Sequence, residues 1–194
     1  MPRQVFLYDP PERFVVGTVG EPGARAFFLQ ARAGGRVTSV GLEKEQVAVL
    51  ADRVDDLLDQ VVRRSGGSAP VPAGVPTDVE DMAPLEQPIL EDFRVGTMAL
   101  AWDADTERVV IEAQALDPEG AEESPPLLED DDDDVDGPDL LRVRLTGPMA
   151  RAFVKRTQAV VSAGRPPCPF CGLPMNPEGH LCPRMNGHRP STRA

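Results

Sequence analysis

The sequence lacks the segments that would place the chain in or across a membrane. No run of about eighteen apolar residues occurs, which excludes a membrane-spanning helix. The first residues contain no apolar core followed by a cleavage site, so we expect no signal peptide. The 194 residues are enough for one domain with appendages. We therefore expect a cytoplasmic protein with its own apolar core.

The sequence also has few of the residues from which catalytic sites are built. Its two histidines both lie near the C-terminus, and it contains no glycine-rich nucleotide-binding loop and no serine-nucleophile motif. Glu112, Gln114 and Gln30 fall on expected strands, where polar side chains are typical of a solvated sheet face. Asp9 and Arg13 form a polar corner whose ordinary role is a turn. We therefore predict no catalytic residues, no organic cofactor and a non-enzymatic role.

Charge is distributed unevenly along the chain. Residues 117–139 contain twelve acidic residues and no basic one, and the net charge of the whole chain is −12. Residues 140–194 contain nine basic residues and one acidic residue, Glu178. The acidic segment cannot bury an apolar face and is expected to be a solvated loop. The basic segment that follows it is a candidate for binding phosphate groups.

Hydrophobic periodicity predicts two sets of strands, each followed by a helix. Val47, Leu50, Val54, Leu58 and Val61 recur at intervals of three and four, which is typical of an amphipathic helix. Thr146 is a plausible N-cap for a second helix that ends near residue 163. Expected strands occupy 3–8, 13–20, 24–32, 36–42, 93–103, 107–115 and 140–145, and expected helices occupy 43–63 and 147–163.

The two halves of this pattern resemble each other. Residues 14–18 (FVVGT) match residues 93–97 (FRVGT), and each half reads as three strands and a helix. We interpret the chain as an α+β fold of two pseudo-repeats of antiparallel strands, each with one helix. Chance similarity between short valine-rich strands is the alternative. The expected parts are a first repeat (1–64), a proline-rich acidic linker or loop (65–92), a second repeat with an acidic insertion at 117–139 (93–163), and a zinc-binding tail (164–194).

The three cysteines of the chain all lie in that tail. Cys168 and Cys171 have the C-x-x-C spacing that lets two thiolates reach one ion, and His180 and Cys182 follow as H-x-C. Three sulfurs and one nitrogen fill the tetrahedral shell of a structural zinc site and leave no position for water. We therefore predict Zn²⁺ bound by Cys168, Cys171, His180 and Cys182. His188 is the rival nitrogen ligand, and a metal-free tail with a reactive thiol pair is the alternative.

Three stretches of the sequence carry a family resemblance: RQVFLYDPPERFVVGTVGEPGARAFFLQAR at residues 3–32, VTSVGLEKEQV at residues 37–47 and CPFCGLPMNPEGHLCPRMNGHRP at residues 168–190. Together they resemble the DUF3090 family of uncharacterised actinobacterial proteins. The resemblance spans nearly the whole chain apart from the acidic insertion and residues 65–84. The family favours Tyr where this chain has His188, and the resemblance therefore favours His180 over His188 as the nitrogen ligand.

The family resemblance says little about activity but suggests partners. Its members tend to occur beside a phosphatidylinositol-kinase-like protein and a histidine-phosphatase-type phosphomutase. This co-occurrence implies a link to phosphate metabolism or signalling. It makes the kinase-like or the phosphomutase-like protein a candidate partner. Our leading hypothesis is a non-enzymatic module that presents the zinc tail to a protein partner. The alternatives are nucleic-acid binding through the basic C-terminal segment and binding or conversion of a phosphate compound.

Overall fold

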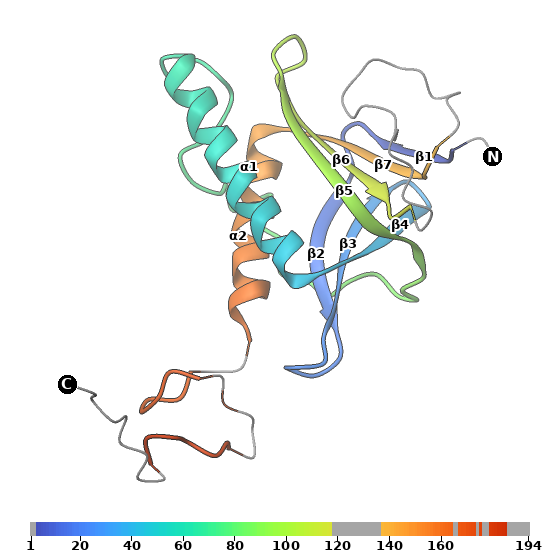
Figure 1. Cartoon of the computed structure of the whole chain (residues 1–194). Helices are drawn as coiled ribbons and strands as arrows, with labels where there is room; N and C mark the ends of the chain where they lie inside the picture. The colour runs from blue at the N-terminus through green and yellow to red at the C-terminus, as the bar shows by residue number, and fades with distance from the viewer. Residues whose placement is uncertain (1–2, 118–136, 165–166, 174, 176–178, 186–194) are drawn as a thin grey trace.

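A computed structural model of the chain describes residues 3–117, 137–164, 167–173, 175 and 179–185. It contains one mixed sheet and two helices, which makes the fold α+β (Figure 1). The elements are β1 (Val5–Tyr8), β2 (Arg13–Val19), β3 (Ala26–Ala33), β4 (Arg36–Leu42), α1 (Lys44–Arg64), β5 (Glu91–Asp103), β6 (Arg108–Ala115), β7 (Leu140–Leu145) and α2 (Gly147–Ser162). Within the described residues, neither helix is long and apolar enough to cross a membrane.

The seven strands lie in the order β1-β7-β6-β5-β4-β3-β2. Neighbouring strands are antiparallel within the trio β2-β3-β4 and within the trio β5-β6-β7. β4 runs parallel to β5, and β1 runs parallel to β7. The expectation of a purely antiparallel sheet is therefore wrong for these two strand pairs. The parallel β4–β5 pair is possible because the chain between these strands includes α1 and the long 65–90 segment, which together make a crossover connection.

Both helices contribute to one core on the same face of the sheet. The core cluster includes side chains from every strand together with Val47 and Leu50 of α1 and Ala150 and Phe153 of α2. α1 buries the side chains at its three-and-four spacing, as the periodicity predicts. Thr146 caps α2 by accepting a hydrogen bond from the backbone N–H of Met149 at 3.3 Å, as expected.

Each helix also bonds to strands of the other set. The Phe153 ring of α2 stacks on Phe14 of β2 with centroids 4.9 Å apart, and Arg156 Nε donates to the carbonyl of Val16 at 2.7 Å. At the start of α1, Gln46 Nε2 donates to the carbonyls of Val95 and Gly96 in β5, each at 3.2 Å. The two sets of strands are therefore held together by both helices.

Residues 65–90 contain no helix or strand, but part of the segment is fixed on the sheet's second face. Leu85 is buried beside Val15 and Phe28, directly over Gly17. Gln30 accepts from the backbone N–H of Glu86 at 2.8 Å and donates to its carbonyl at 3.3 Å. Because one carboxamide bonds to both the N–H and the C=O of a single residue, Gln30 holds this stretch in a fixed position on the sheet.

The polar strand residues are not on a solvated face, contrary to our expectation. Gln30, Glu112 and Gln114 are all at most 2% exposed. Glu112 Oε1 accepts from Arg142 Nε at 2.5 Å across the β6–β7 pair, so its charge is compensated. Sequence alternation cannot reveal this burial, because it shows which residues share a face and not what covers that face. The solvated loop expected at 117–139 lies, from 118 to 136, outside the described residues.

Candidate metal centre

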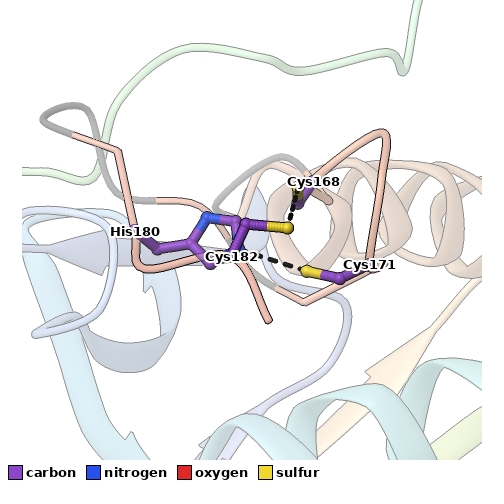
Figure 2. Close-up of side chains that lie close together, drawn as sticks. All are labelled: Cys168, Cys171, His180 and Cys182. Atoms are coloured by element: carbon purple, nitrogen blue, oxygen red, sulfur yellow. Dashed lines mark hydrogen bonds between the residues drawn. The ribbon is translucent and has the colours of Figure 1, made fainter. Parts of the chain in front are cut away.

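The four predicted ligands converge in the tail beyond α2. One donor atom from each of Cys168, Cys171, His180 and Cys182 lies within 4.8 Å of the other three. Figure 2 shows the thiols of Cys168 and Cys171 facing the ring of His180 and the thiol of Cys182. In Figure 1 this segment lies past the C-terminal end of α2, away from the sheet. The cluster is therefore a separate feature of the molecule and not part of the core.

A tight turn positions the first pair of thiols. The Gly172 N–H donates to the carbonyl of Cys168 at 2.8 Å, and the Cys168 N–H donates to the carbonyl of Leu173 at 2.8 Å. Gly172 has φ +74°, which a residue with a side chain rarely adopts. The C-x-x-C-G sequence thus folds locally so that both sulfurs point to the same side.

The spacing of the two buried sulfurs matches the separation that a tetrahedral metal ion would require. Cys168 Sγ lies 3.9 Å from Cys182 Sγ, and Cys171 Sγ lies 3.1 Å from His180 Nε2. Zinc–sulfur bonds of about 2.3 Å at tetrahedral angles place two sulfurs about 3.8 Å apart. The thiols are free cysteines, and their separation is far longer than the roughly 2.05 Å of a disulfide. The buried Nδ1 of His180 has no hydrogen-bond partner in the described structure, which leaves it for an outer partner while Nε2 faces the thiols.

The thiols influence one another's ionisation. Burial raises the pKa of Cys168. Hydrogen bonds from the backbone N–H groups of Cys171 and Phe170 and from the neighbouring thiols lower it by a larger amount, so the net change is a lowered pKa. The backbone N–H of Leu173 lowers the pKa of Cys171, but burial and the adjacent thiols outweigh it, so that pKa is raised. The two thiols therefore differ in the direction of their pKa changes, and two neighbouring thiolates would repel each other. A divalent cation removes that repulsion, so the donor set could hold a metal ion such as zinc.

A profile described as "Protein of unknown function (DUF3090)" matches residues 6–182, which include the sheet, both helices and all four donors. The chain belongs to the DUF3090 family. No curated protein and no solved structure matches it significantly. The family resemblance seen in the sequence is therefore confirmed, and the family's description assigns no activity. His188 of this DUF3090 chain lies outside the described residues.

Five of the nine basic residues after residue 139 are engaged in ion pairs of the folded domain, which sequence reasoning missed. Arg151 of α2, for example, bridges Asp55 and Asp59 of α1. Only the spatial order of the strands and helices reveals such pairing, because the acidic partners are distant in sequence. The five are Arg142 with Glu112, Arg144 with Asp103, Arg151 with Asp55 and Asp59, Lys155 with Glu80, and Arg156 with Asp81.

A cavity of about 440 Å³ lies between β2, residues 78–81 and α2. Two arginines line it, but their guanidinium groups are already engaged. Arg13 donates to Asp81 and to the carbonyls of Ala83 and Pro84, and Arg156 donates to Asp81 and to Val16. Arg13 and Arg156 therefore hold the 65–90 segment of this DUF3090 protein in place beside the cavity.

Proposed function

We propose that the tail binds one structural zinc ion through Cys168, Cys171, His180 and Cys182, and that the zinc-ordered tail docks a protein partner. A shell of three sulfurs and one nitrogen leaves no position for a reacting water, which favours a structural role over a catalytic one. The protein is on this view a cytoplasmic, non-enzymatic interaction module. Its candidate partners are the kinase-like and phosphomutase-like proteins that the family resemblance suggests.

Large apolar side chains around the cluster carry this proposal. Phe170, Leu173, Leu181 and Met185 are 55%, 51%, 87% and 68% exposed, and each lies within three residues of a zinc ligand. Single exposed apolar residues are ordinary, but several on one short segment are typical of a surface that binds another protein. A metal cluster can hold such residues in water without an apolar core beneath them.

The engaged basic residues support a protein partner over a nucleic acid. Five of the nine bases in residues 140–194 already neutralise carboxylates of the same chain. Phe170 is the only aromatic residue of the tail, so stacking platforms for bases are scarce. Nucleic-acid binding would then depend on the few arginines of the tail itself.

We also infer that β2-β3-β4-α1 and β5-β6-β7-α2 descend from one duplicated unit. Both units have an antiparallel trio followed by a helix, and this shared order of elements supports the inference. The matches of Gln30-Ala31 and Leu42 with Gln114-Ala115 and Leu145 are matches of sequence only, because Gln30 lies opposite Val15 whereas Gln114 lies opposite Thr97. An experimental structure would test this by superposition of the two units. If superposing β2-β3-β4 on β5-β6-β7 does not also bring α1 onto α2, the duplication is rejected.

Interaction of the zinc-loaded chain with the two candidate partners tests the proposed function. We expect the wild-type chain to bind one of them in a direct assay, such as biolayer interferometry, and Phe170→Ser/Leu181→Ser to bind it weakly while retaining its zinc. The matched control is Leu90→Ser, because Leu90 is an exposed apolar residue of the segment before β5 and not of the tail. Equal partner binding by the tail variant and the control would contradict the proposal.

A further inference from the structure

We propose that the partner segment recognised by the tail is acidic and carries paired aliphatic side chains. This inference rests on the proposed function and names the chemistry of the partner. It follows from two properties of the tail, the exposed apolar side chains beside the cluster and the excess of basic over acidic residues in its sequence. Neither property alone selects this class of partner, but the two together do.

The apolar side chains flank both halves of the metal cluster. Phe170 lies between the first two ligands and Leu173 directly after them, while Leu181 lies between His180 and Cys182. Leu181 is 87% exposed although both of its neighbours in the chain are cluster ligands. A partner that covered these side chains would remove their apolar surface from water, which favours binding. The partner must therefore supply aliphatic or aromatic groups of its own.

The charge of the tail selects an acidic partner. Residues 164–194 contain four arginines and one glutamate, and three thiolates with a zinc ion would add one negative charge, which leaves a net charge of about +2. Arg184 follows Cys182 by two residues, is exposed, and makes no ion pair with any described residue. It thereby differs from Arg142, Arg144, Arg151 and Arg156, which are paired within the folded domain. Complementary charge would steer and orient an acidic segment on the tail.

A separate partner fits the geometry better than the chain's own acidic segment. That segment leaves the sheet after β6 and returns at β7, where Leu140 bonds to Gln4 near the N-terminus. Figure 1 shows this end of the sheet on the side of the molecule opposite the tail. A nucleic acid would meet the charge of the tail but has no aliphatic groups for Leu181.

Peptide binding to the full-length, zinc-loaded protein tests the inference. The probe is a fluorescent peptide copying residues 122–136, in which Leu127 and Leu128 lie among acidic residues. The comparison probes are the same peptide with both leucines replaced by serine, and a single-stranded oligonucleotide of similar length. We expect the leucine peptide to bind measurably in fluorescence anisotropy, the serine peptide at least about tenfold more weakly, and the affinity to fall as salt rises.

Two leucine variants of the protein give a matched comparison. Leu181→Ser should weaken binding of the leucine peptide at least about tenfold. Leu90→Ser should not change it, because Leu90 is also highly exposed, at 71%, but lies in the segment before β5. Zinc content is measured for both variants, so a lost tail fold is recognised directly.

Three outcomes would overturn the inference. Equal binding of the two peptides would remove the role of aliphatic groups. Oligonucleotide binding that is tighter than peptide binding and unaffected by Leu181→Ser would assign the tail to nucleic acid. Binding only by a variant whose residues 118–136 are replaced with a short glycine–serine linker would assign the tail to the chain's own segment. Absence of zinc from wild-type protein would instead refute the proposed function itself.

Discussion

Arg156 of α2 donates from Nε to the backbone carbonyl of Val16 in β2, 140 residues earlier in the chain, at 2.7 Å. The same side chain also donates from Nη1 to the carbonyl of Asp81 at 2.8 Å and to its carboxylate at 3.4 Å. One guanidinium group therefore joins the second helix, the first strand set and the 65–90 segment.

Replacing Arg156 should destabilise the fold strongly. Its side chain is only 6% exposed, so Arg156→Ala leaves buried carbonyls without a donor and removes a partner of Asp81. We expect a loss of about 3 kcal/mol in the free energy of unfolding, measured by urea denaturation. Lys155→Ala is the neighbouring control, because Lys155 is 54% exposed and its pair with Glu80 should be worth at most about 1 kcal/mol. Similar losses in the two variants would show that the Arg156 bonds do not matter.

The Asp81 carboxylate should make stability depend on pH in the acid range. Hydrogen bonding from Arg13, opposed by partial burial and reinforced by the Ala83 N–H and the charges of Arg13 and Arg156, lowers the pKa of Asp81 below its ordinary value of 3.8. The ionised form is thus favoured in the folded state. Its contribution is fully present above the ordinary value and is lost as pH falls through the lowered pKa.

Asp81→Asn should therefore be less stable than wild type at neutral pH, by about 1–3 kcal/mol, and the gap should close as pH falls below about 4. Urea denaturation followed by circular dichroism over that range measures it. Asp78→Asn serves as the control, because Asp78 is exposed and makes no ion pair within the described structure. A gap that is constant with pH would exclude the carboxylate charge as the source.

The position of Leu85 requires a residue without a side chain at Gly17. A Cβ atom at Gly17 would lie 2.5 Å from Leu85 Cγ, so Gly17→Ala must displace the leucine or the strand. We expect a loss of about 1–3 kcal/mol, as for other overpacked sites, together with faster hydrogen exchange near residue 86. Gly35→Ala should be nearly neutral, because a Cβ atom there meets nothing within 4 Å. Unchanged exchange in Gly17→Ala would mean that Leu85 is not anchored at this point.

Removing the metal should release the tail without unfolding the sheet. Cys168→Ser, Cys182→Ser or His180→Ala should abolish stoichiometric zinc in elemental analysis, whereas His188→Ala should retain it. The melting temperature of the core should change little, since the cluster lies beyond α2 and outside the main core cluster. Loss of zinc in His188→Ala with retention in His180→Ala would reverse the assignment of the nitrogen ligand.

Individual helices and strands and the metal cluster can be predicted from local sequence signals, whereas the parallel pairing of strands from different parts of the chain cannot. The spacing of Val47, Leu50 and Val54 is enough to predict α1, and C-x-x-C with H-x-C is enough to bring four donors together. The parallel pairing of β4 with β5 depends instead on how α1 crosses the sheet. No local pattern in either strand encodes that direction.

The contacts of the 65–90 segment show a second limit of sequence reasoning. Its prolines, glycines and acids predict a loop, and the segment has no helix or strand. Its attachment through Asp81 and Leu85 depends on Arg13, Arg156 and Gly17, which are remote in sequence. An aliphatic residue within this polar stretch, such as Leu85, is the kind of local signal that can indicate attachment of the segment to the sheet.

The parallel pairing of β1 with β7 has a consequence for the order in which a newly made chain can assemble. β1 is synthesised before every other strand of this sheet, yet its partners are residues 140–143 of β7. Phe6 and Tyr8 belong to the same core as Leu141 and Val143, so the N-terminal strand must wait unpaired while β2 to β6 are synthesised. The first trio and α1 can associate early, but that edge of the sheet is completed only after most of the polypeptide has been translated.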